Sequence, residues 1–234
     1  MRFLCLHGSG TNSQILETQT AALRYELGDH HTYDFVEGTI PSAVAPEFDG
    51  LVSSKDEFFS YLDLDDRANY LSILEDLDNY ISEEGPFDAV LAFSEGAMIA
   101  ATYIIWKAKQ TPKQQRMAPI FKCAVFFSAW DAYDPDLLSE GVLRPLNPSA
   151  DRDLIRMPTA HIWGVGDASS TKASNVSEIC VSETRQVYVH PGSHEIPGAR
   201  MSSAVKSSVR IIRRVISLVR EIDNQALRMV ERKN

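Results

Sequence analysis

Short apolar segments alternate along the chain with longer stretches whose apolar residues recur at helical spacing. Six segments rich in Val, Ile, Leu and Phe are apolar almost continuously: residues 2–7, 33–38, 88–93, 122–128, 159–164 and 186–190. Continuous apolar runs are typical of strands buried on both faces of a sheet. The helical spacing predicts helices over residues 14–28, 69–83, 96–110, 169–181 and 202–230. The alternation predicts an α/β fold, with a mostly parallel central sheet flanked by helices on both faces.

Residues 40–68 interrupt this alternation because they show no clean period. Irregular segments of this length in compact domains usually form lids or binding loops. The segment contains several aromatic residues, which argue against disorder. We therefore predict a short cap, with a substrate pocket lined by Phe48, Phe58, Phe59 and Tyr61. No repeat or Pro/Gly-rich linker divides the chain, so we expect one domain over residues 1–234.

Charge is distributed unevenly along the chain. The net charge is −9, although residues 200–234 carry nine Lys or Arg against three Asp or Glu. The apolar residues of this basic segment recur with a period near 3.6, which favours a helix that packs on the core over one that lies on a membrane. An acidic chain lacks the concentrated basic surface that nucleic acids require. We expect neither a nucleic-acid partner nor a membrane partner.

Cysteine usage indicates a reducing compartment. Cys5, Cys123 and Cys180 show no metal-ligand spacing, and an odd number of cysteines leaves at least one unpaired. The first apolar run turns polar after six residues, which is too short for a signal peptide, and no run approaches a membrane span of about 20 residues. We expect a soluble cytoplasmic protein without a metal site.

Ser94 stands at the end of a predicted strand, in the stretch "VLAFSEGAMIA". Ala92 and Gly96 flank it in a small-x-Ser-x-small pattern. A nucleophile elbow needs this pattern, because bulky side chains at the two flanking positions would collide with the neighbouring strand and helix. A tight strand-to-helix turn without catalytic function is the alternative. The strand before Ser94 and the helical pattern after it favour the nucleophile.

A base and an acid follow in the order that a serine nucleophile of this kind requires. His194 lies in "PGSHEIP" and Asp167 in "GVGDASS", each just beyond a predicted strand. A serine hydroxyl needs a base to remove its proton and an acid to orient that base. His190 and Asp131 are the competing candidates, and both also stand near strand ends. Asp167 is also suited to an Asx turn or to a helix N-cap.

The anion that forms on the attacked carbonyl requires two backbone N–H donors. We predict the amide of Glu95, directly after the nucleophile, and the amide of Ser9 in the loop "LHGSGTN". Gly8 and Gly10 permit a close backbone approach to a ligand in that loop, although a simple tight turn also explains them. The chain contains neither a P-loop nor a dinucleotide-binding fingerprint, so we expect no cofactor.

Four stretches resemble the fungal serine hydrolases (FSH), a branch of the α/β-hydrolase superfamily: "RFLCLHGSGTNSQIL", "EEGPFDAVLAFSEGAMIA", "HIWGVGDASS" and "VHPGSHEIP". They extend from residue 2 to residue 197. The sequence departs from the usual pattern GFSQGA at Ala92 and Glu95, and from HPGGH at Ser193. Glu95 places an acid beside the predicted oxyanion hole.

The resemblance implies hydrolysis of acyl esters or thioesters through an acyl-serine intermediate. It further implies a possible partner, the acyl carrier protein domain of a polyketide synthase, whose chain the enzyme releases or edits in fungal secondary metabolism. Two alternatives stay open at this point. One is a general short-chain carboxylesterase that is not tied to a synthase, and the other is a non-catalytic binding protein with a hydrolase fold.

Overall fold

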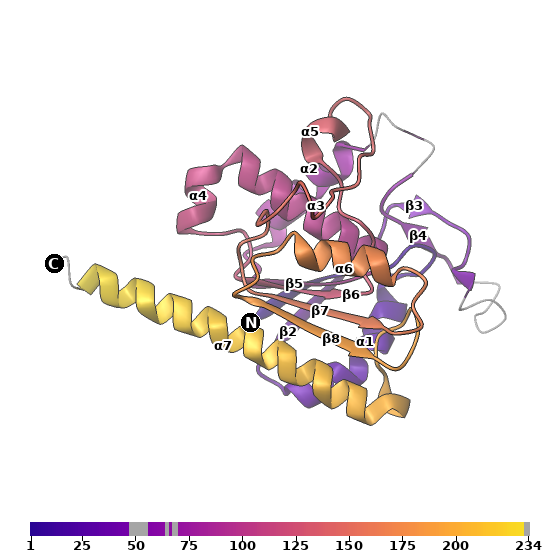
Figure 1. Cartoon of the computed structure of the whole chain (residues 1–234). Helices are drawn as coiled ribbons and strands as arrows, with labels where there is room; N and C mark the ends of the chain where they lie inside the picture. Colours follow the sequence, from indigo (N-terminus) through magenta and orange to yellow (C-terminus); the bar gives the residue numbers. More distant parts are fainter. Residues whose placement is uncertain (47–55, 64–65, 67–69, 232–234) are drawn as a thin grey trace.

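The computed structural model describes residues 1–46, 56–63, 66 and 70–231. Its central sheet has the strand order β2-β1-β5-β6-β7-β8, and every neighbouring pair is parallel (Figure 1). The strands are β1 (Arg2–Leu6), β2 (Thr32–Val36), β5 (Ala89–Phe93), β6 (Cys123–Phe127), β7 (Thr159–Gly164) and β8 (Arg185–His190). All six predicted strands are confirmed, with small shifts at their ends.

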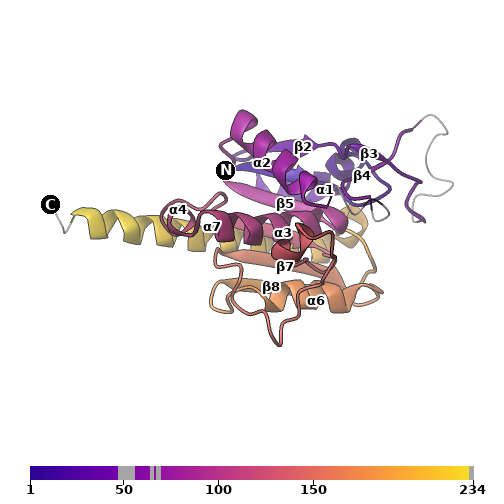
Figure 2. The ribbon, with the colours of Figure 1, turned by 90° about the horizontal axis from the view of Figure 1, so that it is seen from above.

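Helices cover both faces of this sheet, as predicted (Figure 1). Helices α1 (Ser13–Leu27) and α7 (Ser202–Glu231) pack on one face. Helices α2 (Ser72–Glu84), α3 (Glu95–Gln110) and α6 (Ser170–Glu178) pack on the other. Two short helices, α4 (Pro112–Met117) and α5 (Pro135–Leu138), and a 3-10 turn over Ala199–Met201 were not predicted. Helix α7 extends past the sheet towards the C-terminus (Figure 2).

The central strands are apolar throughout because each faces two cores. Every residue of β5 and β6 is buried. In β5, Val90 and Ala92 belong to the core beneath α2 and α3, whereas Leu91 and Phe93 belong to the core beneath α1 and α7. Strand β8 lies at the edge, and its Val187 and Val189 are exposed. Burial on two faces therefore explains the unbroken apolar runs.

Helix α3 begins in close contact with the end of β1. A Cβ atom on Gly96 would lie 2.4 Å from the carbonyl oxygen of His7 and 2.6 Å from that of Leu6. The Gly96 amide donates a hydrogen bond to the His7 carbonyl at 3.1 Å. This contact leaves no room for a side chain, which is the physical reason for the small residue two positions after Ser94.

Part of the predicted cap forms a small antiparallel pair, β3 (Ile40–Pro41) with β4 (Phe59–Ser60). Strand β4 also pairs with the loop after β1, since the Gly10 amide donates to the Phe59 carbonyl at 3.0 Å and the Phe59 amide to the Thr11 carbonyl at 2.8 Å. The predicted cap segment therefore lies against the loop that contains Ser9. Phe48 lies outside the described residues.

Replacing Gly96 with Ala should destabilise the protein by about 1–3 kcal/mol, because the added methyl group overlaps two carbonyl oxygens. Alanine is the better helix former, so a loss of stability can be assigned to the overlap. Gly198→Ala is the matched control, since a Cβ atom there meets no atom within 4 Å. Urea unfolding of both variants measures the difference. Equal stability of the two variants would contradict the packing argument.

Candidate active site

Ser94 occupies a strained turn between β5 and α3. Its φ is 54° and its ψ is −114°, a backbone conformation that residues other than glycine rarely adopt. Hydrogen bonds hold it on both sides, because its amide donates to the Phe127 carbonyl at 2.9 Å and its carbonyl accepts from the Met98 amide at 3.1 Å. The turn presents the hydroxyl above the end of the sheet, as in the predicted nucleophile elbow.

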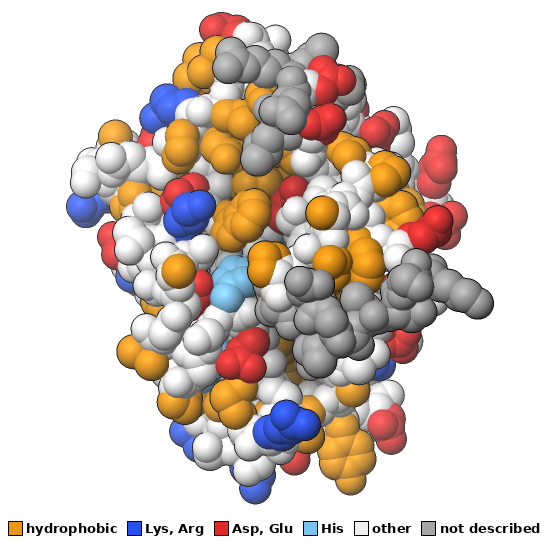
Figure 3. Space-filling model, turned by 90° about the vertical axis from the view of Figure 1, so that its right-hand side faces the viewer, with side chains coloured by type: hydrophobic (Ala, Val, Ile, Leu, Met, Phe, Trp, Pro, Cys, Tyr) orange, Lys and Arg blue, Asp and Glu red, His pale blue; other side chains and the backbone are white. Residues whose placement is uncertain are grey.

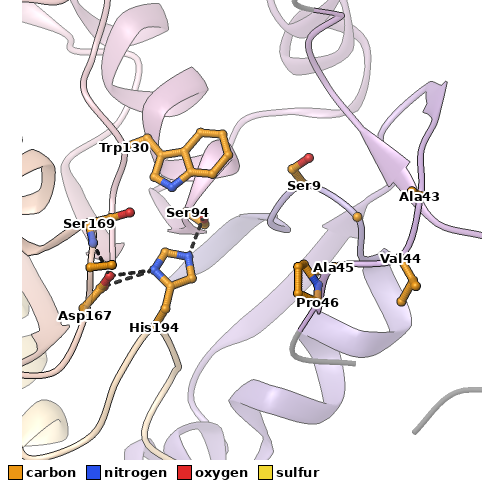
Figure 4. A pocket seen from close by; sticks show the side chains of 12 residues that line it. Ser9, Ala43, Val44, Ala45, Pro46, Ser94, Trp130, Asp167, Ser169 and His194 are labelled. Carbon is orange, nitrogen blue, oxygen red and sulfur yellow. Dashed lines mark hydrogen bonds and ion pairs between the residues drawn. The ribbon is translucent and has the colours of Figure 1, made fainter. Parts of the chain in front are cut away.

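The three predicted catalytic side chains lie in hydrogen-bond contact (Figure 4). Nε2 of His194 lies 2.9 Å from Oγ of Ser94. Nδ1 of His194 lies 3.0 Å from both carboxylate oxygens of Asp167. The Asp167 side chain is fully buried, whereas the His194 side chain is 26% exposed. A proton on Nδ1 is held by the carboxylate, which leaves Nε2 free to accept the proton of the serine.

Asp167 has two roles in the turn after β7. One carboxylate oxygen accepts a hydrogen bond from the Ser169 amide at 2.7 Å, just before α6 begins, while both oxygens face His194. The Asx-turn interpretation and the catalytic interpretation of this residue are thus compatible. The backbone bond fixes the carboxylate that orients the imidazole.

The competing candidates have other partners. Nδ1 of His190 accepts a hydrogen bond from the Gly192 amide at 3.1 Å, and burial lowers the pKa of this histidine. The carboxylate of Asp131 accepts from the side-chain amide of Asn175 at 2.9 Å and so ties the loop after β6 to α6. Both residues have structural contacts of their own, whereas His194 contacts Ser94 and Asp167 contacts His194.

The loop after β1 holds the Ser9 amide in a fixed orientation. Nδ1 of His7 lies 2.8 Å from the Gly8 carbonyl oxygen, and the Thr11 hydroxyl donates to the same oxygen at 2.6 Å. Burial lowers the pKa of His7, which favours a neutral ring that donates from Nδ1. The C=O and N–H of one trans peptide point in opposite directions, so these bonds turn the Ser9 N–H away from His7.

No described residue accepts a hydrogen bond from the amide of Ser9 or of Glu95. Buried or half-buried amides without a partner are uncommon, and a pair of them beside a nucleophile can bind a developing oxyanion. Sequence reasoning named these two donors but missed His7. The histidine directly before the two glycines of "LHGSG" was the available signal.

The carboxylate of Glu95 is buried beneath the cap segment. The residue is 3% exposed, and Oε2 accepts a hydrogen bond from the Tyr61 amide at 3.0 Å. Burial raises the pKa of Glu95 to about 7, and hydrogen bonds from the amides of Tyr61 and Leu62 partly oppose that increase. The acid beside the predicted oxyanion hole thus faces away from solvent and holds the backbone of another segment.

A pocket of about 370 Å³ opens at Ser94. One wall is formed by residues 43–46 and the other by Trp130 and residues 167–169 (Figure 4). On this face of the molecule a histidine side chain is visible at the surface, with hydrophobic side chains beside it (Figure 3). The lining residues are Ser9, Gly10, Ala43, Val44, Ala45, Pro46, Ser94, Trp130, Asp167, Ala168, Ser169 and His194.

The predicted pocket residues require correction. Phe58, Phe59 and Tyr61 do not line this pocket. The Tyr61 ring instead packs on the His7 ring, with 4.7 Å between the ring centres, and its hydroxyl donates to the Val36 carbonyl at 2.7 Å. The Tyr61 side chain thus holds the cap segment in place, and residues 43–46 form the pocket wall.

Trp130 was not predicted, although it follows the apolar strand "KCAVFF" at the same edge as the other site residues. Figure 4 shows its indole ring above Ser94. Its amide donates to the Ser94 carbonyl at 3.3 Å, and the Lys172 ammonium lies 5.2 Å from the centre of the ring. A backbone bond and a cation–π contact therefore hold this wall of the pocket in place.

No helix in the described part of the chain is long and apolar enough to cross a membrane. Within the same residues, no group of three or more His, Cys, Asp or Glu side chains is arranged to hold a metal ion. All three cysteines are unpaired and buried.

A sequence model of the family described as "Serine hydrolase (FSH1)" matches residues 1–205. The chain is 37% identical to "Esterase FPY3" of Fusarium mangiferae over 220 residues, which cover 93% of this chain and 97% of that protein. It is 26% identical to "Esterase FUS5" of Gibberella fujikuroi, with 84% of this chain and 79% of that protein covered.

Among solved structures, a Bacillus cereus carboxylesterase matches with a TM-score of 0.53 and 14% identity, over 89% of this chain and 87% of that one. The thioesterase RedJ from the prodiginine pathway of Streptomyces coelicolor matches with a TM-score of 0.55 and 12% identity, over 90% of both chains. These two matches show a shared α/β-hydrolase fold. The match of the family model to residues 1–205 and the 37% identity to Esterase FPY3 show that the chain belongs to the serine hydrolase (FSH1) family.

Proposed function

We propose that this serine hydrolase cleaves acyl esters and thioesters through a covalent intermediate on Ser94. The observation that carries the proposal is the continuous contact from Ser94 through His194 to Asp167, at 2.9 and 3.0 Å. A serine hydroxyl is a weak nucleophile on its own, and this arrangement supplies the base and the group that orients it.

Acylation begins when Oγ of Ser94 attacks the acyl carbonyl carbon. Nε2 of His194 takes the hydroxyl proton, and the buried carboxylate of Asp167 stabilises the imidazolium that forms. The carbonyl oxygen becomes an anion, which accepts hydrogen bonds from the amides of Ser9 and Glu95. When the tetrahedral intermediate collapses, the bond to the alcohol or thiol breaks, and His194 returns its proton to that leaving group.

Deacylation repeats these steps with water as the nucleophile. Nε2 of His194 accepts a proton from the water molecule while its oxygen attacks the acyl carbon. The same two amides hold the second oxyanion. Collapse returns the proton to Oγ of Ser94 and releases a carboxylic acid, so that the free enzyme is regenerated.

The pocket favours a modest acyl group. Its volume of about 370 Å³ is at the lower end of the range for small-molecule sites. Ala43, Val44 and Pro46 offer aliphatic contacts on one wall, and Trp130 offers an aromatic face on the other. Since a thioester presents the same acyl carbonyl as an ester, this pocket is compatible with both substrate classes.

We further propose that the substrate is a thioester carried on an acyl carrier protein domain. The enzyme would then release a polyketide or another acyl chain from that partner. The open position of the pocket supports it, because a thioester on a flexible arm can reach Ser94 from outside. A short-chain carboxylesterase without such a partner would use the same groups. The unpaired buried cysteines support action in the cytoplasm.

Ser94→Ala should abolish hydrolysis of p-nitrophenyl acyl esters and of N-acetylcysteamine acyl thioesters, because no other group replaces the nucleophile. The circular dichroism spectrum should be unchanged. Ser208→Ala is the matched control, since Ser208 is also buried and its hydroxyl has no hydrogen-bond partner among the described residues. Its turnover should equal that of the parent protein. Turnover by the Ser94 variant at the parent rate would overturn the proposal.

Asp167→Asn should lower kcat by roughly 10³- to 10⁴-fold, because an amide no longer fixes the productive tautomer of His194. Asp131→Asn tests the competing acid and should leave kcat within about twofold, since that carboxylate contacts Asn175. Steady-state kinetics with one p-nitrophenyl ester measures both. A larger loss in the Asp131 variant than in the Asp167 variant would reverse the assignment.

The carrier proposal predicts that an acyl group on a carrier protein is hydrolysed with a kcat/KM at least about tenfold above that of the same acyl group on N-acetylcysteamine. A tenfold gain corresponds to about 1.4 kcal/mol of additional binding, which a modest docking contact supplies. Both substrates share the acyl group and the thioester, so the carrier is the only difference. Equal values would favour the carboxylesterase without a partner.

A further inference from the structure

Glu95 combines two features that separate residues usually provide. Its backbone amide begins α3 beside Ser94. Its carboxylate accepts a hydrogen bond at 3.0 Å from the amide of Tyr61, the residue directly after β4. Among the described residues no cation forms an ion pair with its carboxylate. A buried acid without a cation is unfavourable, which is why burial raises the pKa of Glu95 to about 7. Its hydrogen bonds are therefore its compensation.

Tyr61 continues this connection to the end of β1. Its hydroxyl donates to the Val36 carbonyl at 2.7 Å and accepts from the His7 amide at 3.0 Å. The ring itself is buried and lies against the ring of His7. Tyr61 is thus fixed at its amide by Glu95 and at its hydroxyl by the strand ends. His7 in turn orients the Gly8 carbonyl, and with it the Ser9 amide.

The residues before Tyr61 contact the Ser9 loop directly. Oγ of Ser60 lies 2.6 Å from Oγ of Ser9, and the Phe59 carbonyl accepts from the Gly10 amide at 3.0 Å. On the other side, a Cβ atom on Gly38 would lie 2.6 Å from the Ser60 carbonyl, so β4 has no room to move towards that residue. Residues 59–61 therefore link the Glu95 carboxylate to the loop that contains Ser9.

We propose that Glu95 is a positioning residue as well as an oxyanion donor: its buried carboxylate holds residues 59–62, which keep the Ser9 amide at the distance from Ser94 that the oxyanion requires. One residue then fixes both halves of the oxyanion hole relative to each other. This inference rests on the proposed acyl-serine mechanism, because it assigns a geometry to that mechanism's two donors.

A carboxylate suits this position better than the amide of a glutamine. An ionised carboxylate is an acceptor only, and hydrogen bonds to a charged acceptor are stronger than those to a neutral one. Both the Tyr61 and the Leu62 amides donate towards Glu95. A glutamine side chain accepts through its oxygen alone, and its NH₂ group would face one of these donors. Glutamine should therefore retain part of the contact.

The first test compares Glu95→Ala with Glu95→Gln in the full chain, using one p-nitrophenyl ester. Glu95→Ala should lower kcat by about 10- to 100-fold with KM within about threefold, since displacing a donor costs less than the 10²–10³-fold loss from deleting one. Glu95→Gln should recover kcat to within about threefold. Wild-type kcat in a folded Glu95→Ala variant would overturn the proposal, as would equal losses in both variants.

The second test addresses the next contact and does not depend on Glu95 variants that fold. Tyr61→Phe removes a buried hydroxyl that accepts from the His7 amide. Tyr103→Phe removes a hydroxyl of α3 that donates to Asp78 of α2 at 2.7 Å. Both variants lose one hydrogen-bonded hydroxyl from the interior. Only Tyr61→Phe should lower kcat, by about 3- to 30-fold. Equal kcat values would contradict the proposal.

The third test varies the pH, because only the parent protein has a titratable side chain at position 95. The titratable groups that face Glu95 are the phenols of Tyr61 and Tyr133, and burial raises the pKa of both, so they stay neutral near pH 7. The kcat ratio of parent to Glu95→Gln should be near one below pH 6 and rise to about three above pH 8. A ratio that is independent of pH would contradict the proposal.

The outcomes also separate this inference from the proposed function. If Ser94→Ala is inactive while the Glu95 and Tyr61 variants behave like the parent protein, the acyl-serine mechanism stands and the positioning role fails. If Ser94→Ala keeps full turnover, the mechanism itself fails, and the positioning role fails with it.

Discussion

The contact between Gly96 and the end of β1 determines where every other part of the site can lie. The Gly96 amide donates to the His7 carbonyl at 3.1 Å, so the start of α3 and the loop after β1 meet at one residue. Ser94 lies two residues before Gly96, in the turn that precedes α3, and Ser9 lies two residues after His7, in the loop after β1. The positions of the Ser94 nucleophile and of the Ser9 amide are consequently both fixed relative to the His7 carbonyl oxygen. Because that atom belongs to a fully buried strand end, little freedom remains between them.

The sequence predicts the strands, and the residues that directly follow them, because a local apolar pattern specifies both. Short apolar runs indicated all six strands of the central sheet. The residues just beyond three of these strands are the ones whose side chains the structure brings together: Ser94, Asp167 and His194. His190 was harder to dismiss, since only its contact with the Gly192 amide shows that it turns back into its own loop. Position at a strand end is encoded locally, but the direction of a side chain is not.

The errors concern tertiary contacts. Phe58, Phe59 and Tyr61 were expected in the pocket because aromatic residues in a cap are typical of apolar binding sites. The Tyr61 hydroxyl instead bonds to His7 after β1 and to Val36 at the end of β2, a role that depends on the distance between segments remote in sequence. Trp130 was missed for the same reason, since its amide donates to the Ser94 carbonyl from a loop remote in sequence. His7 orients the carbonyl of the next residue, Gly8, but the Tyr61 ring that packs on it is remote in sequence, and the apolar pattern of the chain does not indicate such a contact.

Glu95 shows how a stability cost and a functional geometry can be joined in one side chain. An acid whose pKa rises on folding binds a proton more tightly in the native state, so its ionisation makes folding less favourable as pH rises from its unfolded-state value to about 7. A neutral residue of the same shape would avoid this loss. The carboxylate nevertheless lies where two backbone amides of the cap segment converge, beside the nucleophile. Strained and electrostatically unfavourable groups tend to cluster where a site must be held rigid, and Ser94 with its positive φ is the immediate neighbour of Glu95.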